Sequence, residues 1–275
     1  MKISNAISFP IATLAFVFSS LVFAQEEAHP KNNSEEFKNS IQSALSALQN
    51  RKFGDELLAP GFGSAASSEF ADTLKAIKTT WNTLVTERGS PEVQYDVIIQ
   101  AGHYLRKFGA TGTEGNFVKE KELTAYLVKG IVENLKKKTT LKVLALSADE
   151  FNPGLRSKLF LAIHADGSTV GCTTGPSLSY QKKSSTLAMH AIGWALGEAL
   201  GYSYHEFRKD GFTANSANYY MFSQIDAPVM KGLLEVGELT CEEKEKMLIT
   251  SADKIASNVA RAIEFVYDTS NSVSR

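Results

Sequence analysis

The sequence lacks most of the short motifs that would assign a protein to an enzyme class. It has only two cysteines, and neither has a CxxC partner, which makes a cysteine-based metal site unlikely to form. The HExxH, HxxE, GxSxG and GxxxxGK[ST] motifs are absent as well. Lysine and arginine number 29 against 30 aspartates and glutamates, so no basic excess indicates a nucleic-acid partner.

Long apolar runs are also absent beyond the N-terminus, so no later segment is predicted to cross a bilayer. Residues 1–24 have the pattern of a secretory signal peptide, with Lys2, an apolar stretch and cleavage after Ala24. The alternative is an uncleaved anchor, which the short stretch and its interruption by Pro10 disfavour. We expect an exported protein, periplasmic or extracellular, without a stable membrane anchor. Loss of Lys2 changes its net charge from −1 to −2.

Periodic apolar residues divide the remaining chain into two parts. Residues 25–92 form an expected N-terminal extension of helices, with apolar stripes at 37–48 and 70–84. From residue 93 to 270, strand and helix patterns alternate, which predicts one α/β domain with helices on both faces of a largely parallel sheet. The expected strands are 95–100, 141–146, 159–163 and 229–234, and the expected helices are 118–135, 185–200 and 251–267.

Three of these strands lead to a residue that can bind a metal or move a proton. The first leads through Ala101-Gly102 to His103, the third ends on His164, and the last ends on Glu235. Open α/β sheets bind ligands at the carboxyl ends of their strands. The pattern therefore predicts a catalytic metal centre assembled from distant parts of the chain.

A catalytic zinc ion usually takes three protein ligands and keeps one position open. His103 and His164 are the best-placed imidazoles. The other histidines lie in the polar leader, in mid-helix and in a loop: His29, His190 and His205. Glu120, near the start of the helix after the first strand, is the preferred third ligand. Glu114 and Glu122 compete with it, because an acidic residue also stabilises a helix N-terminus without any metal.

The remaining carboxylate, Glu235, is predicted to act as general base and acid, taking a proton from water and returning it to a leaving amine. The alternative is a salt-bridged carboxylate at a strand end. Cys172 and Cys241 follow His164 and Glu235 at short distances. They could form a disulfide if their strands are neighbours, or remain two buried thiols.

At these residues the chain resembles the zinc-dependent N-acetylmuramoyl-L-alanine amidases of the type 3 family. That family has a strand ending in Gly-His, a helix opening with Glu-Lys, a strand ending in Ile-His-Ala and a late Leu-Val-Glu-x-Gly. The counterparts here are Gly102-His103, Glu120-Lys121, Ile163-His164-Ala165 and Leu233-Leu234-Glu235-Val236-Gly237, and Arg156 also sits where the family usually has an arginine. The resemblance covers roughly residues 93–268.

The resemblance implies a mixed, mostly parallel sheet of six strands flanked by helices. It implies one zinc ion held by His103, Glu120 and His164, with Glu235 as the catalytic glutamate. The implied reaction is hydrolysis of the amide between N-acetylmuramic acid and L-alanine of the peptidoglycan stem peptide. Peptidoglycan lies outside the inner membrane, in agreement with export.

The chain departs from the family pattern in the walls of the expected cleft. Gln100-Ala101 replaces the usual Asp-Pro before Gly-His, and Tyr104-Leu105 replaces the Gly-Gly after it. Asp166 replaces an Asn, while Glu238 and Cys241 stand where the family tends to have Phe and Asn. The stretches 172–180 and 207–220 are expected to form those walls, so substrate preference is affected more than metal chemistry.

Two other functions stay open at this point. One is a zinc carboxypeptidase or another amidohydrolase of related fold, although the His-x-x-Glu ligand pair is missing at both histidines. The other is a non-catalytic protein that binds the cell wall, which a full set of ligands with Glu235 disfavours. Whether a protein activator is needed is also open.

Overall fold

A six-stranded mixed sheet organises the part of the chain that the computed structural model describes, namely residues 67–181, 186–202, 207–208 and 211–273. The strands are β1 Gln94–Ala101, β2 Val143–Leu146, β3 Leu155–Asp166, β4 Ser177–Tyr180, β5 Ile225–Asp226 and β6 Met230–Glu238. The expected signal peptide, the apolar stripe at 37–48, His29 and His205 lie outside the described residues.

The strands follow the order β2-β1-β3-β6-β4, and β5 pairs with the start of β3. β4 runs antiparallel to β6, while the other pairs are parallel, which confirms the mixed, mostly parallel sheet. Both β3 and β6 are longer than their apolar runs predicted. The first residues of β3 pair with β5, and its last residue, Asp166, pairs with Glu238 of β6. Hydrogen bonding between strands therefore extends β3 and β6 past their apolar residues.

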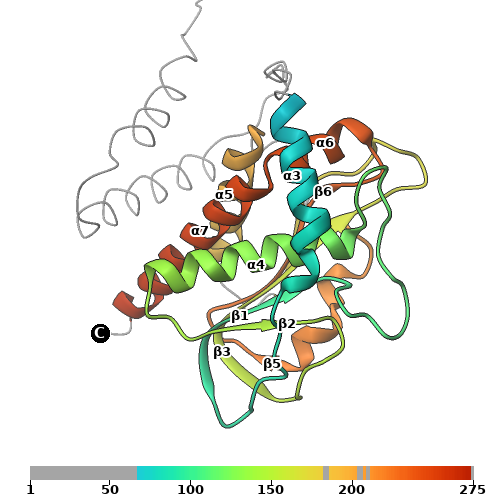
Figure 1. The fold of residues 1–275 in the computed structure, drawn as a ribbon. Coiled ribbons are helices and arrows are strands. Elements are labelled where there is room, and N and C mark those ends of the chain that lie inside the picture. The colour runs from blue at the N-terminus through green and yellow to red at the C-terminus, as the bar shows by residue number, and fades with distance from the viewer. Residues whose placement is uncertain (1–66, 182–185, 203–206, 209–210, 274–275) are drawn as a thin grey trace, which may run out of the picture. The chain divides into compact units, whose positions relative to one another are not determined.

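The described residues contain five α-helices: α3 Ser67–Thr80, α4 Glu120–Lys138, α5 Thr186–Leu200, α6 Glu242–Thr250 and α7 Ala252–Val273. Their buried residues belong to one apolar core on one face of the sheet, where α4 and α5 both pack against α7 (Figure 1). The expected helix at 70–84 stops at Thr80, and the short 3-10 helix η1 Trp81–Thr83 follows it. α3 also packs on α4 and α6.

The other face of the sheet has a separate, smaller core. Within the described residues it is covered by the 3-10 helix η4 Tyr220–Ser223 and the residues after it, rather than by α-helices. Phe222 of η4 meets Phe160 of β3 with ring centroids 6.3 Å apart. Helices therefore cover both faces of the sheet, as expected, but on the second face the helix is a short 3-10 helix.

The order of the strands sets the position of the polar residues at their carboxyl ends. β2 lies on one side of β1 and β3 on the other, so the chain changes direction at β1, where open sheets bind ligands. The amide of Gly102, just after β1, donates to the carbonyl of Ile163 in β3 at 2.9 Å. No helix within the described residues has the length and apolarity of a membrane span.

Candidate metal centre

Three residues of the predicted ligand set lie together at the carboxyl edge of the sheet. His103, Glu120 and His164 each offer one ligand atom, and these atoms lie within 4.8 Å of one another. They come from the turn after β1, the first residue of α4 and the end of β3. His190, in contrast, lies on α5 beside Tyr180 and is not part of this group.

The ring of His103 has its tautomer set by a backbone carbonyl. Its Nδ1 lies 2.9 Å from the oxygen of Ala110, and a carbonyl only accepts, so Nδ1 carries the hydrogen of the neutral ring. Nε2 is left with its lone pair, 3.5 Å from Oε1 of Glu120. Burial lowers the pKa of His103 despite the opposing effect of Glu120, which favours the neutral ring that metals require.

His164 approaches the same carboxylate oxygen from the other side. Its Nδ1 lies 3.0 Å from Oε1 of Glu120, and its Nε2 lies 3.1 Å from the hydroxyl of Tyr219. The rings of His103 and His164 meet edge to face, with centroids 5.1 Å apart and an interplanar angle of 84°. One carboxylate oxygen thus faces two imidazole nitrogens.

Glu120 is almost completely buried, and backbone amides orient its carboxylate. Oε2 accepts from the amide of Thr113 at 2.8 Å, and Oε1 accepts from the amide of Ala165 at 3.1 Å. Burial by itself raises the pKa of Glu120, but the interactions with His164, His103 and Thr113 outweigh it and hold the pKa below its ordinary value. The group therefore stays an anion, as a metal-binding carboxylate must.

The two competing carboxylates have other partners. Glu114 is largely exposed and accepts from Lys119 Nζ at 2.7 Å. Glu122 accepts from Lys78 Nζ at 2.6 Å and from the backbone amide of Lys119 at 2.9 Å, which caps the start of α4. Of the three glutamates considered from the sequence, Glu120 is the one that faces the histidines.

Two glycines allow the backbone to pass this close to the ligand side chains. A Cβ atom on Gly102 would lie 2.6 Å from Nδ1 of His164. Gly112 has a φ of +91°, and its Cβ would lie 2.8 Å from Oε2 of Glu120. Any larger residue at either position would displace a ligand, so these glycines are part of the site.

Glu235 lies beside this group, on β6 directly opposite His164 in the parallel register. It is inside β6 rather than at its end, because the strand continues to Glu238. Within the described residues, its buried Oε2 has no hydrogen-bond partner and no cation pairs with it, so the salt-bridge interpretation is not favoured. Burial, with smaller effects of Glu120 and Asp166, raises the pKa of Glu235 well above its ordinary value.

A family model described as N-acetylmuramoyl-L-alanine amidase matches residues 97–265, which contain all four of these site residues. The chain belongs to this family. No curated protein matches the sequence significantly.

Solved structures named as N-acetylmuramoyl-L-alanine amidases are similar to the chain at low sequence identity. That of Clostridium difficile 630 has a TM-score of 0.48 at 16% identity, covering 64% of this chain and 98% of its own. That of Nostoc punctiforme has 0.46 at 17% identity, with coverages of 68% and 100%. The catalytic domain from Bacillus (Paenibacillus) polymyxa var. colistinus has 0.46 at 21%, with coverages of 65% and 99%.

Several departures from the amidase pattern have structural partners in this chain. Asp166 accepts from the hydroxyl of Thr213 at 3.2 Å, which links the end of β3 to the stretch 207–220. Glu238 is fully buried and accepts from Lys244 Nζ and the amide of Thr174, both at 2.9 Å. These contacts attach the expected wall segments to the sheet edge around the amidase site.

Cys172 and Cys241 form a disulfide between residues 69 positions apart in sequence. The bond is possible because β3 and β6 are neighbours and their following loops leave the sheet at the same edge. It joins the loop after β3 to the turn after β6, close to the Glu238 contacts. The disulfide and these polar contacts hold the same loop in place.

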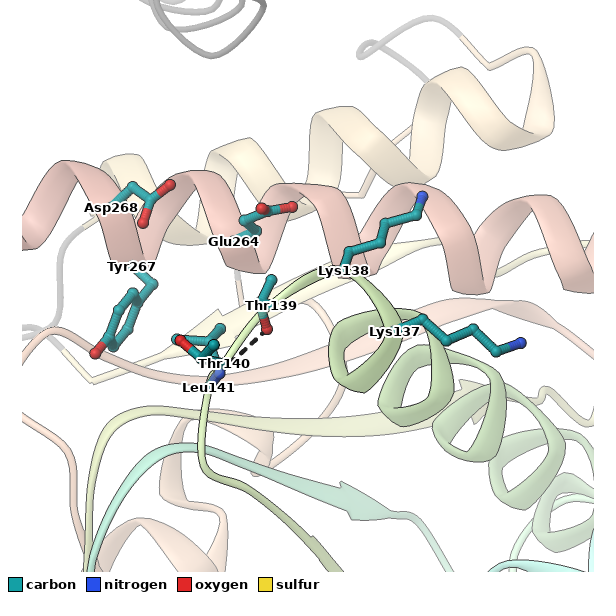
Figure 2. A pocket seen from close by; sticks show the side chains of 8 residues that line it. All are labelled: Lys137, Lys138, Thr139, Thr140, Leu141, Glu264, Tyr267 and Asp268. Atoms are coloured by element: carbon teal, nitrogen blue, oxygen red, sulfur yellow. Dashed lines mark hydrogen bonds between the residues drawn. The ribbon is translucent and has the colours of Figure 1, made fainter. Parts of the chain in front are cut away.

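A depression of about 500 Å³ lies elsewhere on this amidase, at the last turn of α4 (Figure 2). Lys137 and Lys138 border it on one side, with Glu264, Tyr267 and Asp268 of α7 on the other. Glu120 begins α4 and Lys138 ends it, about 27 Å away at the rise of an α-helix. This depression therefore takes no part in the metal centre.

Two residues beside the metal centre were missed from the sequence, Gln100 and Tyr219. Tyr219 was included only as part of the expected wall segment 207–220, and Gln100 only as a departure from the family pattern. A polar glutamine in an otherwise apolar strand was the one available signal. Its partner is 119 residues away, so no local pattern could have linked them.

Proposed function

We propose that this protein is a zinc-dependent N-acetylmuramoyl-L-alanine amidase acting on peptidoglycan. It would hydrolyse the amide between the lactyl group of N-acetylmuramic acid and L-alanine of the stem peptide. The main support is the grouping of two imidazole nitrogens around one oxygen of Glu120. On the neighbouring strand, a buried oxygen of Glu235 has no hydrogen-bond partner among the residues that the structure describes. Family membership supports the amide bond as the target.

The donor set fits zinc in particular. Two imidazoles and one carboxylate are a common ligand set of catalytic zinc, and such a set leaves one position open. His103 holds its hydrogen on Nδ1, so Nε2 is available to bind, and Glu120 is held as an anion by two amides. A zinc ion bound here would supply Lewis-acid activation of the scissile carbonyl and of water.

Glu235 would carry the proton through the reaction. Its carboxylate takes a proton from the attacking water while the water oxygen bonds to the carbonyl carbon of the lactyl group. The bond from this carbon to the nitrogen of L-alanine then breaks, and Glu235 returns the proton to that nitrogen. Burial raises the pKa of Glu235 well above its ordinary value, which makes its carboxylate a stronger base toward the attacking water.

Digestion of purified sacculi tests the bond that is cleaved. Wild-type protein should release intact stem peptides with a free L-alanine amino group, identified by mass. Glu235→Gln should release none, while Glu114→Gln, which changes an exposed carboxylate paired with Lys119, should act like wild type. Shortened stems that stay attached to glycan would instead indicate a peptidase, and no release by wild type would indicate a binding protein.

Metal analysis tests the ligand set separately. Wild-type protein should contain about one zinc ion per chain, as a single site of this type binds one. Glu120→Gln and His164→Ala should lose it, whereas Glu114→Gln and Glu122→Gln should retain it. Zinc retained by Glu120→Gln would show that another carboxylate is the ligand.

The proposal also covers the export of the protein and the boundaries of its domains. We propose that residues 1–24 are a signal peptide, that 25–92 are a helical extension and that 93–270 are the catalytic domain. Peptidoglycan as substrate requires export to the periplasm or the outside of the cell. The intact mass of protein recovered from these compartments should correspond to a chain that begins at Gln25.

A further inference from the structure

A chain of hydrogen bonds connects His164 to the interior of the sheet. Nε2 of His164 lies 3.1 Å from the hydroxyl of Tyr219, and that hydroxyl lies 2.7 Å from Oε1 of Gln100. Gln100 is fully buried in β1, whereas Tyr219 lies between the 3-10 helix η3 Ser216–Asn218 and η4. These hydrogen bonds therefore connect a proposed metal ligand to two residues that are not ligands themselves.

The side-chain amide of Gln100 can take only one orientation. Its Nε2 lies 3.0 Å from the carbonyl oxygen of Ser147 and 3.3 Å from that of Ala148, and both of these oxygens only accept. A flipped amide would place Oε1 against two carbonyl oxygens in a buried site, which is unfavourable. Oε1 must therefore face Tyr219.

The orientation of Gln100 determines where the hydrogen of Tyr219 lies. An amide oxygen only accepts, so the single hydroxyl hydrogen of Tyr219 is donated to Gln100. The hydroxyl oxygen can then interact with His164 only by accepting a hydrogen from Nε2. In the neutral ring, this leaves the lone pair on Nδ1, which lies 3.0 Å from Oε1 of Glu120.

Tyr219 is also held in place by its surroundings. Its ring meets the ring of Tyr220 with centroids 4.7 Å apart and that of Phe222 with centroids 5.7 Å apart, both at steep angles. Its own ring meets that of His164 edge to face at 5.3 Å. The hydroxyl is thus presented to His164 by a packed aromatic group and does not depend on a mobile side chain.

We propose that Tyr219, held by Gln100, is a positioning residue that makes Nδ1 the metal-binding nitrogen of His164. This inference rests on the zinc site of the proposed function. In it, Nδ1 of His164, Nε2 of His103 and Oε1 of Glu120 present three electron pairs to one cation. Outer hydrogen bonds of this kind fix the tautomer and orientation of a ligand imidazole.

Zinc affinity tests the effect of the hydroxyl. Tyr219→Phe removes one oxygen atom and keeps the packed ring, so we expect zinc to bind about 10- to 100-fold more weakly, as for other outer-shell changes. Tyr126→Phe is the matched control, because its hydroxyl donates to Asp253 at 2.8 Å, away from the ligands. The dissociation constants are measured on metal-free protein by competition with a chromophoric chelator.

Nitrogen NMR of zinc-loaded wild-type protein tests the nitrogen assignment without any substitution. We expect His164 to show a protonated Nε2 and a zinc-bound Nδ1. A zinc-bound Nε2 with the hydrogen on Nδ1 would overturn the inference, whatever the affinity of the variants.

The outcomes separate this inference from the function on which it rests. If wild type and Tyr219→Phe bind zinc equally tightly, the positioning role is wrong and the zinc site stands. If wild type binds no zinc, both are wrong. Weaker binding by Tyr219→Phe, unchanged binding by Tyr126→Phe and a protonated Nε2 together support the inference.

Discussion

At the scale of single residues, Glu235 occupies an unfavourable position for a carboxylate, and it is the residue proposed to transfer the proton. Its carboxyl is buried next to Glu120 and Asp166, and one of its oxygens has no hydrogen-bond partner within the described residues. Burying a carboxylate in this way costs free energy of folding, which appears as a raised pKa. Residues that reduce stability in this manner are often those that a reaction requires.

The stability of the metal-free protein should therefore respond to Glu235→Gln in a pH-dependent way. The pKa of Glu235 is ordinary, 4.5, when the chain is unfolded, and it is raised in the folded state. As pH rises above 4.5, the unfolded state releases its proton first, so wild-type stability falls until the folded carboxyl also ionises. The variant avoids this loss and should be the more stable protein above that window.

Urea unfolding of metal-free protein across this pH range measures the difference. The stability difference between the two proteins should be constant below pH 4.5 and should change in favour of Glu235→Gln above it. Glu242→Gln is the control, because Glu242 lies on the surface of α6 in an exposed pair with Lys246. Parallel stability curves for wild type and Glu235→Gln would contradict the prediction.

At the scale of elements, the loop between β1 and α4 carries His103 and leads into Glu120, and α6 holds it. Glu245 of α6 is fully buried and accepts three backbone hydrogen bonds of 2.8 Å from Asn116, Phe117 and Val118. A Cβ atom on Gly115 would collide with this carboxylate. The loop is therefore held to α6 by its backbone, immediately before the first turn of α4.

Glu245→Gln should destabilise the protein by about 1–3 kcal/mol, because the new NH2 group would face at least one buried amide hydrogen. Urea unfolding of the variant measures this loss. Glu243 lies two residues before Glu245, on the exposed side of α6. Glu243→Gln makes the same chemical change at the surface and should leave the free energy of unfolding nearly unchanged. A loss of similar size in both variants would show that the three amide bonds are not the cause.

At the scale of the whole molecule, the disulfide connects the ends of two neighbouring strands that are far apart in sequence. Cys172 and Cys241 are separated by 69 positions, and the segment they enclose contains β4, α5, β5 and all of β6. Closing a loop of this length reduces the freedom of the unfolded chain more than it affects the folded one. By the chain-entropy model it contributes about 4 kcal/mol to the free energy of unfolding.

Cys172→Ala with Cys241→Ala should lower the free energy of unfolding by roughly that amount, and reductant should do the same to wild type. Thermal or urea unfolding with and without reductant measures both effects. Reductant should leave the double variant unchanged, since the chain has no other cysteine. Unaltered wild-type stability, with both thiols shown to be free, would contradict the prediction.

Local sequence patterns were enough to predict the main strands and the residues that follow them. Apolar runs long enough to be buried on both faces predicted β1, β3 and β6, and they therefore brought His103, His164 and Glu235 to one edge. Short elements with polar or mixed residues were missed, including β4, β5 and α6. Their formation depends on pairing and packing partners supplied by the rest of the fold, and this information is absent from a local pattern.

The groups that meet at that edge followed from the packing of whole elements. Spacing alone could not separate the preferred Glu120 from Glu114 and Glu122, whereas in the structure Glu120 faces the histidines and the other two pair with lysines. The pairing of Cys172 with Cys241 and the contact of Gln100 with Tyr219 also depend on strand order. Contacts between distant residues require the register and direction of whole elements, and these are set when the chain packs.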